Sequence, residues 1–180
     1  MYNLLVTAGE GAWDESSYTL DLSRFLEHTE EVPKVRFSAL DEVAIAALQQ
    51  LPTLFAYEKG NDASARVGRI KTLQRRGRDI RITYEFNHAI SPIEPKRLEE
   101  LAWELEINDY EMNRTHWSVK EADLLDVLRV ANLLGENVSI PASFRFSRAT
   151  VINACDKGLS RIMWGASEQD QARSPLPNYR

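Results

Sequence analysis

The chain has 180 residues, of which 43% are hydrophobic and 27% charged, and its formal net charge is −5. This balance is typical of one soluble globular domain, and the acidic surplus argues against sequence-blind DNA binding. The single cysteine, Cys155, excludes an intramolecular disulfide and a cysteine-rich zinc site. Because no apolar stretch approaches a membrane span and the first residues lack a secretory signal, we expect a cytoplasmic protein without membrane contact.

The first part of the chain predicts a short apolar strand over residues 2–8. Two glycines then end it, and Trp13 follows in a polar loop, where its indole must find cover. Residues 18–29 are ambiguous, because their apolar positions fit a strand that turns into a helix, with Ser23 as the helix N-cap.

The next segment predicts one helix and one strand. After Ser38, six apolar residues recur at three- and four-residue spacing and draw a helical stripe that ends before Pro52. The stripe consists of Leu40, Val43, Ala44, Ala47, Leu48 and Leu51. Residues 53–58 alternate enough for a strand.

The clearest pattern is a β-hairpin with arms at residues 66–74 and 78–86, joined at 75–77. In the second arm, isoleucine and aromatic residues alternate with polar ones, so one face is expected to be buried and the other wet. Gly68 interrupts the first arm and is interpreted as a bulge or a bend.

The later part of the chain predicts helices. One covers residues 98–105. Another begins at a capping box over residues 118–121, with Trp117 packing just outside the cap, and ends at Gly135. A last helix is expected after Ser147. We predict one domain over residues 1–164 and a disordered tail over residues 165–180.

These elements predict an α+β fold. A small antiparallel sheet, built around residues 53–86 and able to curl into a barrel, is expected to pack against three or four helices.

The most unusual chemical feature is the charge of the hairpin. Between residues 66 and 81 the only carboxylate is Asp79, against seven cationic side chains. They are Arg66, Arg69, Lys71, Arg75, Arg76, Arg78 and Arg81. Guanidinium groups bind phosphates and carboxylates bidentately, so the hairpin is a candidate binding surface for nucleic acid or an acidic protein. The alternative is a solvated face balanced by the acidic residues of 94–111.

A second candidate site is the polar corner at residues 113–117. His116 titrates near neutrality and suits a general base, Arg114 suits an anion, and a carboxylate such as Glu111 would complete a pocket. The alternative is structural, with the same side chains satisfying nearby backbone groups. No serine or cysteine nucleophile is paired with this corner by any pattern.

No motif predicts a metal or a cofactor. His28, His88 and His116 are far apart and lack the spacing of a metal site. The glycines near the N-terminus lack the third glycine and the lysine of nucleotide-binding loops. We therefore expect neither a cofactor nor a metal.

Two blocks, NRTHWSVKEADLLDVL at residues 113–128 and the RVGRI…RRGRDIRITYEF hairpin, resemble accessory domains of bacterial multidomain proteins, some of them linked to phage defence. The resemblance covers residues 1–155 and implies a sensing or docking module fused to an effector. It carries over no site residues. Because no effector follows here, the chain is expected to be a stand-alone partner or a truncated form.

The sequence thus predicts a non-enzymatic binding or regulatory module that docks a macromolecular partner, most simply a protein, through the basic hairpin and the Arg114/His116 corner. The first alternative is a small-barrel nucleic-acid binder that uses the same arginines. The second is an enzyme with a pocket at Arg114 and His116. The sequence does not predict the oligomeric state.

Overall fold

The computed structural model describes residues 1–134. The predicted helix end at Gly135, the helix after Ser147, the domain boundary at residue 164 and the tail at residues 165–180 all lie outside the described residues.

A six-stranded sheet with the strand order β2-β5-β4-β3-β1-β6 organises the fold. Its strands are β1 (Tyr2–Thr7), β2 (Ser17–Asp21), β3 (Pro52–Tyr57), β4 (Arg66–Arg76), β5 (Asp79–Phe86) and β6 (His116–Lys120). The α-helices are α1 (Glu31–Phe37), α2 (Glu42–Gln50), α3 (Pro95–Glu100) and α4 (Leu124–Val130), and short 3₁₀ turns cover Ala12–Asp14, Leu22–Arg24 and Glu111–Asn113.

The α+β class is confirmed, but the sheet is mixed and open. β1 pairs with β3 in parallel, and the chain between these two strands carries β2, α1 and α2. The other pairings are antiparallel. The antiparallel sheet expected around residues 53–86 is confirmed in β3, β4 and β5, and β1 extends it by a parallel pairing with β3. The sheet does not close into a barrel, because β2 and β6 remain as its edges.

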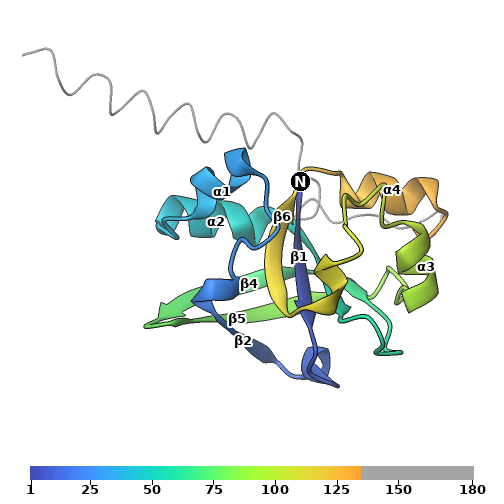
Figure 1. Cartoon of the computed structure of the whole chain (residues 1–180), viewed down its shortest axis with the longest axis horizontal. Helices are drawn as coiled ribbons and strands as arrows, with labels where there is room; N and C mark the ends of the chain where they lie inside the picture. The colour runs from blue at the N-terminus through green and yellow to red at the C-terminus, as the bar shows by residue number, and fades with distance from the viewer. Residues whose placement is uncertain (135–180) are drawn as a thin grey trace, which may run out of the picture. The chain divides into compact units, whose positions relative to one another are not determined.

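Two hydrophobic cores lie on opposite faces of the sheet. Side chains of α1, α2 and the adjoining loops pack on one face, against inward residues of all six strands. α3 and α4 pack over the other face of β1 and β3. Figure 1 shows α1 and α2 together on one side of the strands and α3 and α4 together on the other. The second pair of helices leaves the outer face of the hairpin uncovered. On that face Thr72, Gln74 and Arg76 of β4, and Asp79 and Arg81 of β5, are exposed.

The stripe helix is confirmed as α2, although it begins later than expected. Asp41 is its N-cap, and the Asp41 carboxylate accepts a hydrogen bond of 2.8 Å from the Ala44 amide. Leu48 is fully buried, as the stripe predicts. Val43 is the exception, because it is 66% exposed.

The predicted hairpin is confirmed as β4 and β5, with Ile80 and Ile82 buried on the inner face. The register shift lies between Ile70 and Thr72 and not at Gly68. Gly68 instead lies against the β5 backbone so closely that a Cβ there would collide with the carbonyl oxygen of Glu85.

The predicted capping box at residues 118–121 was wrong. His116–Lys120 form β6, which pairs antiparallel with β1, and α4 begins only at Leu124 with Asp123 as its N-cap. Trp117 therefore does not pack beside a helix start; it is fully buried in the sheet core. Strand pairing across the whole domain outweighs the local capping signal.

Three smaller expectations had different outcomes. Ser23 is not an N-cap; its amide donates to Asp21, which caps the short turn after β2. The helix expected over residues 98–105 is shorter, because α3 ends at Glu100. Trp13 is covered as expected: it is fully buried, and its indole donates to the carbonyl of Ala56 over 2.8 Å.

Candidate functional site

The proximal half of the hairpin holds its cations in surface ion pairs. Arg66 lies 2.7 Å from Asp14, while Arg69 and Lys71 both contact Glu85, at 2.5 and 3.5 Å. The pair with Arg69 lowers the pKa of Glu85 below its usual value, chiefly through the hydrogen bond between them. These three cations are therefore all held in ion pairs, although Arg69 and Lys71 share one carboxylate.

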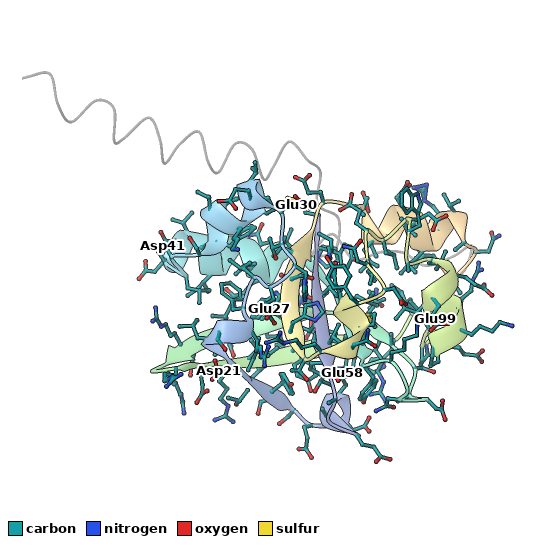
Figure 2. The ribbon with its side chains drawn as sticks, in the orientation of Figure 1. Asp21, Glu27, Glu30, Asp41, Glu58 and Glu99 are labelled. Carbon is teal, nitrogen blue, oxygen red and sulfur yellow. The ribbon has the colours of Figure 1, made fainter. Side chains whose placement is uncertain are left out.

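The distal half is different. Its arginines, which we call the hairpin tip, are Arg75, Arg76, Arg78 and Arg81. All four are exposed, and none makes an ion pair with any carboxylate in residues 1–134. Nearby negative charge comes from Asp79 and Asp21, which are exposed register partners in β5 and β2 (Asp21 is labelled in Figure 2).

The tip arginines are presented on more than one side of the ribbon. Arg76 is opposite Asp79 and Arg81 is opposite Gln74, so these residues share the uncovered face of the hairpin. Arg75 is opposite the buried Ile80 and therefore lies on the other face, beyond the helices. The hairpin's rings, in contrast, pack inward with the core, so the uncovered face offers no aromatic surface.

The structure separates Arg114 from the other residues of the second predicted site. Arg114 is exposed and lies 3.4 Å from Glu27, whereas His116 has no exposed surface. Glu111, the carboxylate suggested for a pocket, does lie next to His116: the distance from His116 Nε2 to Glu111 Oε2 is 3.8 Å. His116 and Glu111 are thus brought together, and the Arg114 side chain is not part of their cluster.

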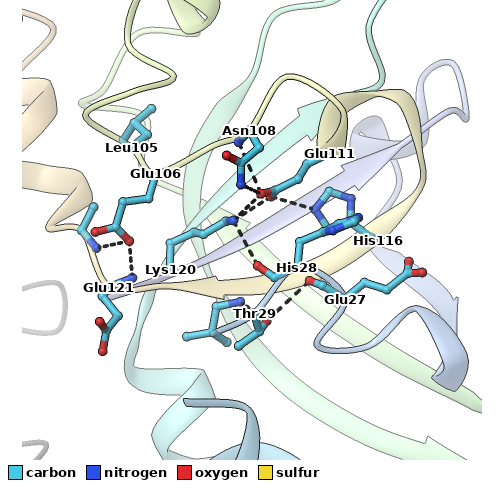
Figure 3. A network of polar contacts seen from close by, with 12 residues as sticks. Glu27, His28, Thr29, Leu105, Glu106, Asn108, Glu111, His116, Lys120 and Glu121 are labelled. Atoms are coloured by element: carbon cyan, nitrogen blue, oxygen red, sulfur yellow. Dashed lines mark hydrogen bonds and ion pairs between the residues drawn. The ribbon is translucent and has the colours of Figure 1, made fainter. Parts of the chain in front are cut away.

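A buried ion pair lies at the centre of this cluster (Figure 3). Lys120, on β6, is 5% exposed and donates to Glu111, which is fully buried, over 2.8 Å. The same ammonium donates to the carbonyl of His28. Asn108 adds a 2.7 Å hydrogen bond from its side-chain amide to Glu111. The cluster therefore fastens the loop before β6, and the turn at His28, to the edge of the sheet.

His116 is held neutral beside this pair. Burial is the main cause, and the neighbouring His28 the second, of a His116 pKa lowered to about 4. Nδ1 lies 2.8 Å from the carbonyl oxygen of Arg114, which can only accept, so the ring proton is assigned to Nδ1. Nε2 is then an acceptor facing the Glu111 carboxylate, and two acceptors cannot form a hydrogen bond with each other.

Unsatisfied polar atoms concentrate in this cluster. Four buried side-chain atoms of residues 1–134 have no hydrogen-bond partner, and three of them are Glu111 Oε2, His116 Nε2 and Ser118 Oγ. Ser118 lies between His116 and Lys120 on the same face of β6. Buried polar atoms are normally paired, so their gathering at one place marks the cluster as costly to fold.

The sequence suggested Glu111 and His116 but missed Lys120, Asn108 and His28. Lys120 was assigned to a helix start, where its side chain would be solvated. The available signal was the alternation of His116, Ser118 and Lys120 with two apolar residues, which is the period of a strand.

No protein-family model matches the chain, and no similar curated protein or solved structure was found. Among residues 1–134, no group of three or more His, Cys, Asp or Glu side chains could hold a metal ion. No helix in this part of the chain is long and apolar enough to cross a membrane.

Proposed function

We propose that the chain is a docking module whose hairpin tip binds an acidic surface of a partner protein. The observation that supports this most is the contrast along the hairpin, where the proximal cations are held in ion pairs and the four distal arginines are not. Arg76 and Arg81 donate only to the neutral side chains of Gln74 and Ser17, each over 3.2 Å. Charge-assisted hydrogen bonds to carboxylates are stronger than such neutral ones, so an acidic partner would cost few existing contacts.

The strands that carry the tip are anchored in the core, which favours docking. Leu73, Ile80 and Ile82 anchor the inner face of both strands in the core. Thr72 and Thr83 are hydrogen-bonded across the strands on the outer face, 2.7 Å apart. A partner would therefore meet arginines on a preformed ribbon, with little ordering cost for the backbone.

A protein partner is favoured over single-stranded nucleic acid by the position of the rings. Proteins that bind single strands stack bases on exposed aromatic side chains. Tyr84 is 8% exposed and Phe86 packs against the same core, so the hairpin presents no such platform. The resemblance to accessory domains agrees with a docking role, with an effector protein in the cytoplasm as the partner.

The test compares two polyanions, polyglutamate and a short DNA duplex, as probes of the full chain. We expect polyglutamate to bind, with affinity falling as salt rises, and replacement of all four tip arginines by Gln to weaken it at least about tenfold. The matched control replaces four exposed cations outside the hairpin by Gln, so that the net charge changes equally: Lys34, Lys96, Arg114 and Arg129. This control should bind like the natural chain.

Other results would contradict the proposal in distinct ways. Binding of the duplex without polyglutamate would make the protein a nucleic-acid binder. Absence of binding to either probe at low salt would leave the tip as a solvated hairpin end. Equal losses in the tip and control variants would show that only net charge matters.

A further inference from the structure

At the other edge of the sheet, a hollow of about 460 Å³ opens beside β6. Its floor includes Lys120 and Glu111, and its walls come from the segment at residues 28–30 and the loop at residues 102–110. This volume is in the range of small-molecule pockets. The residues of the hairpin tip do not line it, so anything it binds is independent of the docking proposed above.

Two aromatic rings in the lining are unusually exposed. Trp103 is 89% exposed and Tyr110 is 61% exposed, whereas Trp13 and Trp117 are fully buried. Tyr110 is held in place by His28, whose ring centre is 5.3 Å away in an edge-on arrangement. Exposed indole and phenol rings next to a hollow are the groups that most often anchor a ligand.

The lining is also acidic. It contains four carboxylates and a single ammonium group, that of Lys120, which Glu111 already neutralises. The other three carboxylates, Glu30, Glu106 and Glu121, make no ion pair with any described residue. Figure 2 shows Glu30 at the start of α1, and Figure 3 shows Glu106 and Glu121 beside the Lys120 end of the network.

The fourth carboxylate of the lining, Glu111, is already engaged within the protein. Glu111 has no exposed surface, and its Oε2 accepts no hydrogen bond with suitable geometry, although it lies 2.7 Å from Lys120 Nζ. Oε1 takes the hydrogen bonds from Asn108 and Lys120 instead. Oε2 also lies 3.8 Å from His116 Nε2, and His116 does not line the hollow. The charge of Glu111 is therefore used within the protein, and the three exposed carboxylates are the ones open to a ligand.

We propose that this hollow binds an organic ammonium ion with an apolar body. The ammonium group is recognised by the carboxylates of Glu30, Glu106 and Glu121, and the apolar body packs against the ring of Trp103. Aromatic faces attract cations, most strongly at tryptophan, so rings and carboxylates favour the same ligand charge. A carboxylate or phosphate ligand would meet repulsion from every unpaired charge of the lining.

The test uses three probes of similar size: 2-phenylethylammonium, neutral 2-phenylethanol and anionic 3-phenylpropanoate. Binding to the full chain is followed by the indole N–H resonance of Trp103, assigned with the Trp103→Phe variant. We expect the ammonium probe to shift this resonance saturably at millimolar concentrations, the alcohol to bind more weakly, and the carboxylate not to bind.

Variants then separate the two parts of the site. Trp103→Ala should weaken binding about two- to thirtyfold, and Glu30→Gln with Glu121→Gln should weaken it about two- to fivefold for each carboxylate. These exposed positions leave the core unchanged. Glu104→Gln, at an exposed residue that does not line the hollow, is the matched control and should bind normally.

Several results would overturn the proposal. The first is equal binding of the ammonium and alcohol probes, which would mean that charge is not recognised. The second is an unchanged affinity for the ammonium probe in the Glu30→Gln/Glu121→Gln variant. The third is that the ammonium probe shifts the resonances of the buried Trp13 and Trp117 but not that of Trp103.

Discussion

The buried ion pair between Lys120 and Glu111 makes a quantitative prediction about stability. Lys120→Met keeps most of the length of the side chain but removes the ammonium group, and the fully buried carboxylate of Glu111 then has only Asn108 as a donor. Breaking one side of a buried pair costs about 3–5 kcal/mol, because the remaining charge stays buried without compensation. For a chain of this length, that corresponds to a fall in Tm of about 6–20 °C.

The assay is urea denaturation of the full chain at constant salt, followed by far-ultraviolet circular dichroism. The double variant Glu111→Gln/Lys120→Met should be more stable than Lys120→Met alone, because no charge is then left buried. The matched control is Lys59→Met, which removes an ammonium group that lies 2.7 Å from Asp109 but is 45% exposed. It should cost less than about 1 kcal/mol.

The reasoning would be refuted if Lys120→Met cost no more than Lys59→Met. It would also be refuted if the two changes at Lys120 and Glu111 were additive, since additivity would mean that the two groups do not interact. If Lys120→Met does not fold, the recovery of folding in the double variant carries the same information.

Three further predictions concern single positions near the same strands. The pKa of His116 is lowered to about 4 from 6.5. Because the unfolded chain therefore binds the proton more readily, the free energy of unfolding should fall by about 3 kcal/mol as the pH drops from 6.5 to 4. His116→Gln should flatten that decline in urea titrations at stepped pH. Ser118→Ala removes a hydroxyl group without a partner and should leave the unfolding free energy within about 1 kcal/mol of its starting value. Gly68→Ala drives a Cβ into the backbone of Glu85 and should cost about 1–3 kcal/mol in the same assay.

Local sequence patterns correctly predicted the elements in which the spacing of apolar residues over a few positions determines which side chains are buried. β5 alternates strictly between inward and outward side chains, and the structure buries Ile80 and Ile82 as that period requires. α2 has a helical stripe and an acidic N-cap at Asp41. In these segments local preference and tertiary packing agree, so the sequence was sufficient.

The elements that could not be predicted depend on distant partners. Residues 118–121 have the pattern of a capping box, yet Ser118 pairs with Leu4, more than a hundred positions earlier. The parallel pairing of β1 with β3 is likewise invisible to local patterns, because strand direction is set by the route of the chain between them. In both cases the sheet's continuous pairing outweighs the local preference.

The candidate sites differ in the same way. The density of positive charge in the sequence identified the hairpin tip. It did not show which arginines lack ion pairs, because only the fold brings Asp14 to Arg66 and Glu85 to Arg69. The buried cluster could not be identified as such. Glu111 lies in a segment with the composition of a solvated loop. Only the folding of that loop over β6 removes the Glu111 carboxylate from water.

The sheet separates the two proposed sites physically. β5 and β4 lie towards one edge of the strand order and β6 forms the other edge, so four interstrand steps of about 4.8 Å, or roughly 19 Å, divide β5 from β6. At such distances substitutions act independently unless an element between them has two arrangements. β3 and β1, which lie between, are buried along their whole length on both faces. The effects of tip and hollow variants should therefore add, and ammonium binding should leave polyglutamate affinity unchanged; a measurable coupling between the two ligands would require a rearrangement of this doubly covered centre.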